Sequence, residues 1–328
     1  MKIGLIADVQ YADTDDAWDF HQTHLRRYRA SLMYLKAAVD SWSREKVDVI
    51  VSLGDLIDGR NREIENEAIK AAAVVMKDFD RMRDTPLIHL IGNHDLYNFP
   101  RSHLVAGIDL KDVSRPLKYS NSQGATYYEV PLTSKWSAII LDGYSNSMLA
   151  NGGGRIGKEL DSTCIDEQAL NLCQSNNPNP LTAYQVDFFR NLPSGPSQRW
   201  VPLNGGLGEI QRHWLDDTLT KLKFSGKFAI VFCHPVFHPD ATPNGNCQTL
   251  LWDYLETLEI IRKSGIVKLA IAGHAHQEGY CQDGITHHVT LPSPLETTNP
   301  TECSATLTLF DDGSAELVGY TSRLFNAK

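Results

Sequence analysis

Residues 87–95, Leu-Ile-His-Leu-Ile-Gly-Asn-His-Asp, join a short apolar run to a group of polar residues that can bind metal. The first five of these residues predict a buried β-strand. Asn93, His94 and Asp95 then offer an amide, an imidazole and a carboxylate directly after it. A strand that ends on such groups predicts a site at the carboxyl end of a sheet.

Four other apolar runs end in the same way. They lie at about 3–7, 48–53, 228–232 and 267–272. The polar residues that follow them are Asp8 and Gln10, then Asp55, then His234, then His274 and His276. Each of these features alone is common in turns, but five in succession favour one metal site. Because the carboxyl ends of parallel strands meet at one edge, we expect the side chains to converge.

The spacing of apolar residues predicts the rest of the fold. Amphipathic helices are expected at about 25–42, 64–82, 183–190, 208–224 and 250–263. Further strands are expected at about 126–130, 137–142, 285–291, 304–310 and 314–320. Alternation of strands and helices predicts an α/β core with parallel pairing. We expect one domain over residues 1–328, with a Gly/Asn/Pro-rich insertion at about 143–206.

Composition narrows the class of protein. The 328 residues are 42% hydrophobic and carry a formal net charge of −9, which excludes general disorder and predicts no nucleic-acid partner. The chain contains no long apolar run and no signal peptide, so we expect neither a membrane partner nor secretion. Six dispersed cysteines favour a cytoplasmic location, although Cys164 and Cys173 could pair in an oxidising compartment.

The order of the motifs resembles the calcineurin-like metallophosphoesterase superfamily, whose signature runs D-x-H, G-D, G-N-H-[DE], H, G-H-x-H. This resemblance implies a four-layer α/β/β/α sandwich and two divalent metal ions. It also implies a ligand set for each ion. The first metal would bind Asp8, Gln10 and His276, the second Asn93, His234 and His274, and Asp55 would bridge both.

One position departs from that signature, because Gln10 stands where most members have histidine. A glutamine offers a neutral carbonyl oxygen, which is a harder ligand than imidazole nitrogen. The change therefore favours Mn²⁺, or alternatively Mg²⁺, over zinc, iron and copper. The alternative interpretation is a lost metal and an inactive protein.

The same departure makes the chain resemble the manganese-dependent ADP-ribose/CDP-alcohol diphosphatases. The stretches that carry this resemblance are 7–13, 204–215 and 273–280. It implies hydrolysis of the phosphoanhydride of ADP-ribose, CDP-choline and related nucleoside diphosphate compounds to a nucleoside monophosphate and a phosphorylated product. It also implies substrate contacts at Phe20 and Cys247, while Tyr280 is a candidate for stacking on a base or ribose.

Two residues are expected to serve the chemistry directly. His94 is the predicted proton donor to the leaving oxygen, and Asp95 is expected to orient its imidazole. Two other functions stay open: a cyclic nucleotide phosphodiesterase or phosphomonoesterase of the same superfamily, and a metal-binding scaffold without turnover. The sequence leaves the oligomeric state undecided.

Overall fold

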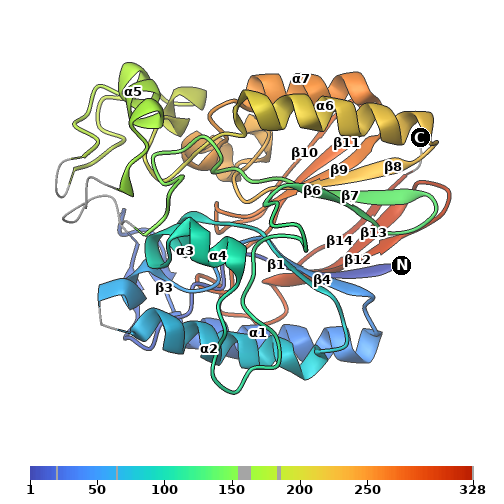
Figure 1. The fold of residues 1–328 in the computed structure, drawn as a ribbon, viewed down its shortest axis with the longest axis horizontal. Helices are drawn as coiled ribbons and strands as arrows, with labels where there is room; N and C mark the ends of the chain where they lie inside the picture. The colour runs from blue at the N-terminus through green and yellow to red at the C-terminus, as the bar shows by residue number, and fades with distance from the viewer. Residues whose placement is uncertain (20, 64–65, 154–163, 183–185, 327–328) are drawn as a thin grey trace.

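The computed structural model describes residues 1–326 apart from residues 20, 64–65, 154–163 and 183–185. Two six-stranded sheets face each other, and helices cover the outer face of each sheet (Figure 1). The four-layer α/β/β/α sandwich is therefore confirmed.

In the first sheet the strand order is β14-β13-β12-β1-β4-β5. The parallel part consists of β1 (Lys2–Ile6), β4 (Val49–Ser52) and β5 (Leu87–His89). The antiparallel part consists of β12 (Ser304–Leu309), β13 (Ala315–Gly319) and β14 (Ser322–Phe325). The chain thus places its first strand in the middle of this sheet.

In the second sheet the order is β10-β11-β9-β8-β7-β6. Its parallel strands are β7 (Trp136–Ile140), β8 (Phe228–Phe232), β9 (Val267–Ala272) and β11 (Thr286–Thr290). Its antiparallel edges are β6 (Tyr128–Pro131) and β10 (Gly279–Asp283). A separate short hairpin pairs β2 (Ala17–Trp18) with β3 (Leu25–Arg26).

The helices divide between the two outer faces (Figure 1). The first sheet is covered by α1 (Tyr28–Glu45) and α2 (Glu67–Phe79), and the second by α6 (Gly208–Phe224) and α7 (Tyr254–Ser264). Shorter helices are α3 (Asn93–Asn98), α4 (Arg101–Ala106) and α5 (Glu167–Asn176). Among the described residues, no helix has the length and apolar character needed to cross a membrane.

Alternate residues of the central strands bury on opposite faces, which explains the layers. In β1, Ile3 and Leu5 pack between the two sheets, while Ile6 packs toward α1 and α2. Trp42 of α1 lies so close to this strand that a Cβ atom at Gly4 would approach the indole to 2.8 Å. Glycine at this position therefore lets the helix lie directly on the strand that leads to the site.

Most of the expected elements are confirmed, with bounds that shift by a few residues. One helix is wrong: the described part of 183–190 forms turns, and α5 (Glu167–Asn176) is the helix of this region. Asp166 caps α5 by accepting a hydrogen bond from the Ala169 N–H at 2.8 Å. The expected stretch has the right apolar spacing, but spacing alone does not supply a surface against which to bury it.

His89, at the end of β5, is a buried histidine outside the metal-binding positions. Its side chain lies between Phe79 and Tyr119, and both of its ring nitrogens are buried without a hydrogen-bond partner. Burial, helped by the charge of Arg115, lowers the pKa of His89 to about 3. The unfolded chain binds a proton at this residue below about pH 6.5, while the folded chain resists it. The contribution of His89 to the free energy of unfolding is therefore fully present above pH 6.5 and is lost as the pH falls toward 3.

We predict that His89→Leu reduces the acid-induced loss of stability. Between pH 8 and pH 5 the wild-type chain should lose about 2 kcal/mol through this histidine, a loss that the variant cannot show. Urea unfolding at both pH values, compared with the exposed-site control His213→Leu, measures it. An unchanged pH dependence in His89→Leu would contradict the assignment.

Candidate metal centre

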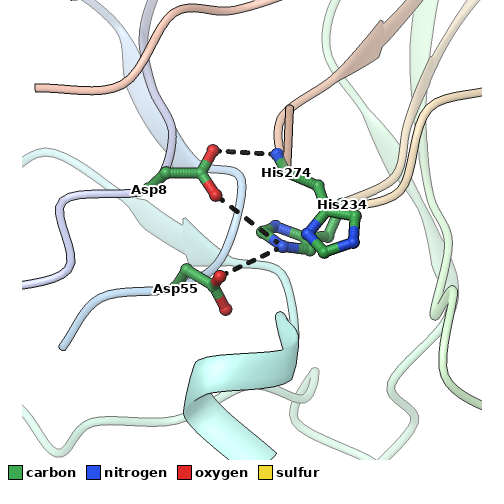
Figure 2. A group of neighbouring side chains, drawn as sticks. All are labelled: Asp8, Asp55, His234 and His274. Carbon is green, nitrogen blue, oxygen red and sulfur yellow. Dashed lines mark hydrogen bonds and ion pairs between the residues drawn. The ribbon is translucent and has the colours of Figure 1, made fainter. Parts of the chain in front are cut away.

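The two sheets direct their parallel strand ends at one point. Asp8 and Asp55 follow β1 and β4 of the first sheet, and His234 and His274 follow β8 and β9 of the second. Figure 2 shows these four side chains pointing toward one another. Each offers one donor atom, and the four atoms all lie within 4.8 Å of one another. The predicted convergence is therefore present, across two sheets rather than along one.

The other expected donors lie beside this group. The Gln10 Nε2 atom lies 2.7 Å from His276 Nε2 and 3.1 Å from Asp55 Oδ2. Asn93 opens α3, and its Oδ1 accepts a hydrogen bond from the Tyr144 hydroxyl at 3.2 Å. The structure thus gathers all seven positions that the sequence singles out as metal ligands.

Several donor atoms in this group are buried without any hydrogen-bond partner. They are Asp8 Oδ1, Gln10 Oε1 and His234 Nε2. An unpaired buried polar atom costs free energy, and an unpaired carboxylate costs much more. Divalent cations would supply the missing partners and the positive charge that two buried aspartates need. The donor set therefore fits two divalent cations, with oxygen and nitrogen ligands of the kind that Mn²⁺ accepts.

The backbone at the site is left-handed at five of the seven donor residues. The φ angles are 53° at Asp8, 43° at Gln10, 57° at Asp55, 67° at His274 and 62° at His276. Residues other than glycine rarely adopt this conformation, which costs on the order of 1 kcal/mol or more each. The loops keep it because packing and backbone hydrogen bonds fix them, such as those from the Asp8 N–H to the Gly54 oxygen and from the Gln10 N–H to the Asp55 oxygen.

Each of the three histidines predicted as metal ligands has a partner at one ring nitrogen. The contacts are His234 Nδ1 with the Leu53 carbonyl oxygen, His274 Nε2 with Asn204 Oδ1, and His276 Nδ1 with Glu296 Oε1, each at 2.7 Å. Such partners fix ring direction and leave the other nitrogen for the metal. Asn204 belongs to a stretch that carries the family resemblance, whereas no sequence signal marks Glu296.

Asp95 has a different task from the one expected. Its carboxylate accepts hydrogen bonds from the N–H groups of Gly92, Asp55 and Leu56 and from the Tyr119 hydroxyl, at 2.8–3.1 Å. Burial, and then the charge of Asp55, raises the pKa of Asp95 to about 6. Asp95 therefore ties the loop after β4 to the loop after β5. The expectation that it orients His94 is corrected, since these four groups bond its carboxylate and the His94 imidazole is not among them.

The carboxylate beside His94 is Asp58. Its Oδ2 lies 3.2 Å from His94 Nδ1, and the Gly59 N–H donates to the same nitrogen at 2.9 Å. Burial alone would raise the pKa of Asp58, but the His94 imidazole and the Arg60 N–H lower it below its usual range. Both contacts engage Nδ1, so Nε2 is the nitrogen that faces a substrate. The spacing Gly54-Asp55-x-x-Asp58-Gly59 is the signal in the sequence that could have identified this residue.

A cavity of about 660 Å³ opens above the donors. Its floor includes Gln10, Asp55, His94 and His276. Its walls come from the β2–β3 hairpin and from distant loops, including His21, Phe188, Phe189, Asn246, Gln248 and Thr249. The His21 and Phe189 rings lie 5.7 Å apart and are tilted by 51°. The cavity thus joins a floor that includes predicted metal donors to a wall with aromatic rings and amide groups.

The whole set of motifs matches one family. Residues 1–278 match the family model described as calcineurin-like phosphoesterase. The chain belongs to the calcineurin-like phosphoesterase family. Gln10 is therefore a departure within a chain of this family whose other predicted donors all have the expected residue type.

Individual relatives extend the likeness to nearly the whole chain. The chain is 34% identical over 315 residues to a Danio rerio manganese-dependent ADP-ribose/CDP-alcohol diphosphatase, covering 94% of this chain and 92% of that protein. The Homo sapiens protein of the same name is 31% identical over 321 residues, covering 95% and 87%. A crystal structure of a dimetal phosphatase from Danio rerio aligns with a TM-score of 0.84 at 29% identity, covering 100% of this chain and 99% of that one.

The three expected substrate contacts of this phosphoesterase have different outcomes. Phe20 lies outside the described residues. Cys247 is buried, and its thiol donates to the Gly245 carbonyl oxygen at 3.6 Å, although its neighbours Asn246 and Gln248 line the cavity. The Tyr280 hydroxyl contacts His287 at 2.9 Å beneath the Arg323 guanidinium, away from the cavity. In the described part of the chain, neither Cys247 nor Tyr280 is among the residues that line it.

Gly92 is required by the close approach of two ligand loops. A Cβ atom there would lie 2.1 Å from Asp55 Oδ1 and 2.7 Å from the Asp55 backbone nitrogen. Neither atom can move away freely, because Asp55 is the predicted bridging ligand and its N–H donates to Asp95. Any larger residue at position 92 must therefore displace Asp55, the predicted bridging ligand.

We predict that Gly92→Ala lowers bound manganese from about two ions per chain to fewer than one. Metal analysis after dialysis measures the change. Gly226→Ala is the matched control, since a Cβ there meets no atom within 4 Å while the left-handed φ of 65° imposes its own backbone cost. Full metal content in Gly92→Ala would show that Asp55 tolerates displacement.

Proposed function

We propose that this chain hydrolyses the phosphoanhydride of ADP-ribose, CDP-choline and related nucleoside diphosphate compounds. The products are a nucleoside monophosphate and a second phosphorylated compound. The observation that carries the proposal is a cavity whose lining combines five of the seven predicted metal donors with aromatic and amide side chains; these donors are Gln10, Asp55, Asn93, His274 and His276. The names of the relatives at 30–34% identity support the same reaction.

The size and lining of the cavity suit a nucleoside diphosphate. Pockets for small ligands usually measure about 300–1,000 Å³, and about 660 Å³ accommodates a base, a ribose and a diphosphate. The diphosphate would lie over the metal donors, and a base could stack against His21 or Phe189. Asn246 and Gln248 offer amide groups for the polar edge of a base or ribose.

We propose two divalent cations at this site, with Mn²⁺ the favoured ion. Bound there, the cations neutralise the charge of the phosphoryl oxygens and favour ionisation of water. Gln10 supports Mn²⁺, since it contributes an oxygen donor where an imidazole would favour softer metals. Asp8 and Asp55 supply the two negative charges that hold the ions.

His94 is the proposed proton donor. Its Nδ1 is held by Asp58 and by the Gly59 N–H, so Nε2 can hold a proton toward the leaving oxygen at the cavity floor. Protonation of that oxygen stabilises the leaving phosphate as the bond to phosphorus breaks. Asp58 and the Gly59 N–H lie on the Nδ1 side of the ring and so fix its direction.

The insertion at about 143–206 is proposed to form part of the substrate wall within a single domain. Four residues of this segment line the cavity: Val186, Phe188, Phe189 and Leu203.

A cytoplasmic location also stays a proposal, supported by six cysteines that are all free in the structure. The partner we propose is a small-molecule substrate.

We predict that metal-stripped protein releases AMP from ADP-ribose and CMP from CDP-choline only after Mn²⁺ is added. Chromatography of the products measures both, and parallel reactions with zinc test the preference for a hard ion. Cleavage of cyclic AMP or a simple phosphomonoester, without release from either diphosphate, would move the chain to another activity of the family. Bound metal without turnover on any substrate would identify a scaffold.

We predict that His94→Ala lowers turnover by roughly 10²-fold or more, because the leaving oxygen loses its proton donor. Bound manganese should remain at the wild-type level, since His94 is not among the proposed ligands. Asp58→Asn should lower turnover in the same direction, while exposed His213→Ala should leave it unchanged. Wild-type turnover in His94→Ala would remove this residue from the mechanism.

A further inference from the structure

Glu296 is the one charged group among the partners that orient the three ligand histidines. Leu53 offers His234 a neutral carbonyl oxygen, and Asn204 offers His274 a neutral amide oxygen. Glu296 offers His276 a carboxylate oxygen at 2.7 Å from Nδ1. A carboxylate partner makes an imidazole a stronger electron donor to its metal than a neutral partner does.

The Glu296 carboxylate is buried and is held by a second contact. Its side chain is 8% exposed, and the Arg26 Nε donates to its Oε1 at 3.2 Å. Arg27 also donates to the Glu296 backbone oxygen at 3.4 Å. The guanidinium of Arg26 gives this buried carboxylate a cationic partner. The group is therefore a fixed anion immediately behind the metal-binding imidazole.

The position of this anion matters because of Gln10. The first metal is assigned Asp8, Gln10 and His276, with Asp55 shared between both ions. Gln10 is a neutral oxygen donor and therefore a weaker ligand for first-row metals than the histidine usual in the family. The imidazole that carries the extra carboxylate is the one that shares a metal with this weaker ligand, and Gln10 Nε2 lies 2.7 Å from His276 Nε2.

We propose that Glu296 is a positioning residue for the first metal: it holds His276 through Nδ1, directs Nε2 at the ion, and adds the donor strength that Gln10 does not provide. The inference concerns metal binding and holds whichever phosphate compound is the substrate. Arg26, which lies in the β2–β3 hairpin, donates a hydrogen bond to Glu296 and also lines the cavity. The hairpin that carries the substrate wall is thereby tied to the first metal site.

The test is Glu296→Gln, which keeps the shape and an acceptor oxygen but removes the charge. We expect the affinity of the first site for Mn²⁺ to fall by roughly 10- to 100-fold, while the second site keeps its ion. Equilibrium dialysis with metal analysis should then show about one ion per chain at Mn²⁺ concentrations that give two in the wild type. Electron paramagnetic resonance should change from the spectrum of a coupled manganese pair to that of an isolated ion.

Two further variants separate positioning from general damage. Glu302→Gln is the matched control: this exposed carboxylate lies near Glu296 and bonds Asn299, and its loss should leave both ions bound. Gln10→His combined with Glu296→Gln should restore the second equivalent of metal, because imidazole is the stronger ligand. Unchanged manganese affinity and an unchanged coupled spectrum in Glu296→Gln would overturn the proposal. Equal loss of both ions, or failure of Gln10→His to restore binding, would overturn it as well.

Discussion

Two buried carboxylates at close range are the constraint on which the rest of this structure depends. Asp8 and Asp55 are fully buried, and their donor atoms lie in one group of 4.8 Å extent. Burial, together with the charge of Asp55, raises the pKa of Asp8. Such a pair is stable as two anions only where positive charge lies between them. The imidazoles supply part of it, and bound divalent cations would supply the rest.

The sandwich provides the rigidity that this arrangement needs. The donors come from β1 and β4 of one sheet and from β8 and β9 of the other, and an apolar core between the sheets fixes the distance. Hydrogen bonds from Asp95 then lock the loops that follow β4 and β5. Packed interiors resist small displacements, so the surrounding fold holds the left-handed backbone at the donors.

Binding and chemistry are supplied by different parts of the chain. The donors follow the sheet strands, whereas His21, Phe188 and Phe189 reach the cavity from a hairpin and from the long middle segment. A family that keeps the strand ends and varies these walls can act on different phosphate compounds with one metal centre. The partners at the second ring nitrogens of the histidines also differ: one is a backbone oxygen, one an amide oxygen and one a carboxylate. These differences can adjust how strongly each imidazole donates to a metal.

The sequence by itself implied the four-layer fold, through its resemblance to the phosphoesterase family, and predicted seven metal donors. Each donor follows an apolar strand, and local pattern is enough to recognise such positions. Only the tertiary structure decided that Asp58 rather than Asp95 lies beside His94, since sequence adjacency does not determine where a side chain points. It also decided the role of Glu296, which stands 20 residues after His276 but returns to contact it. Side-chain direction and long-range contact depend on how both sheets pack, and no short stretch of sequence contains that information.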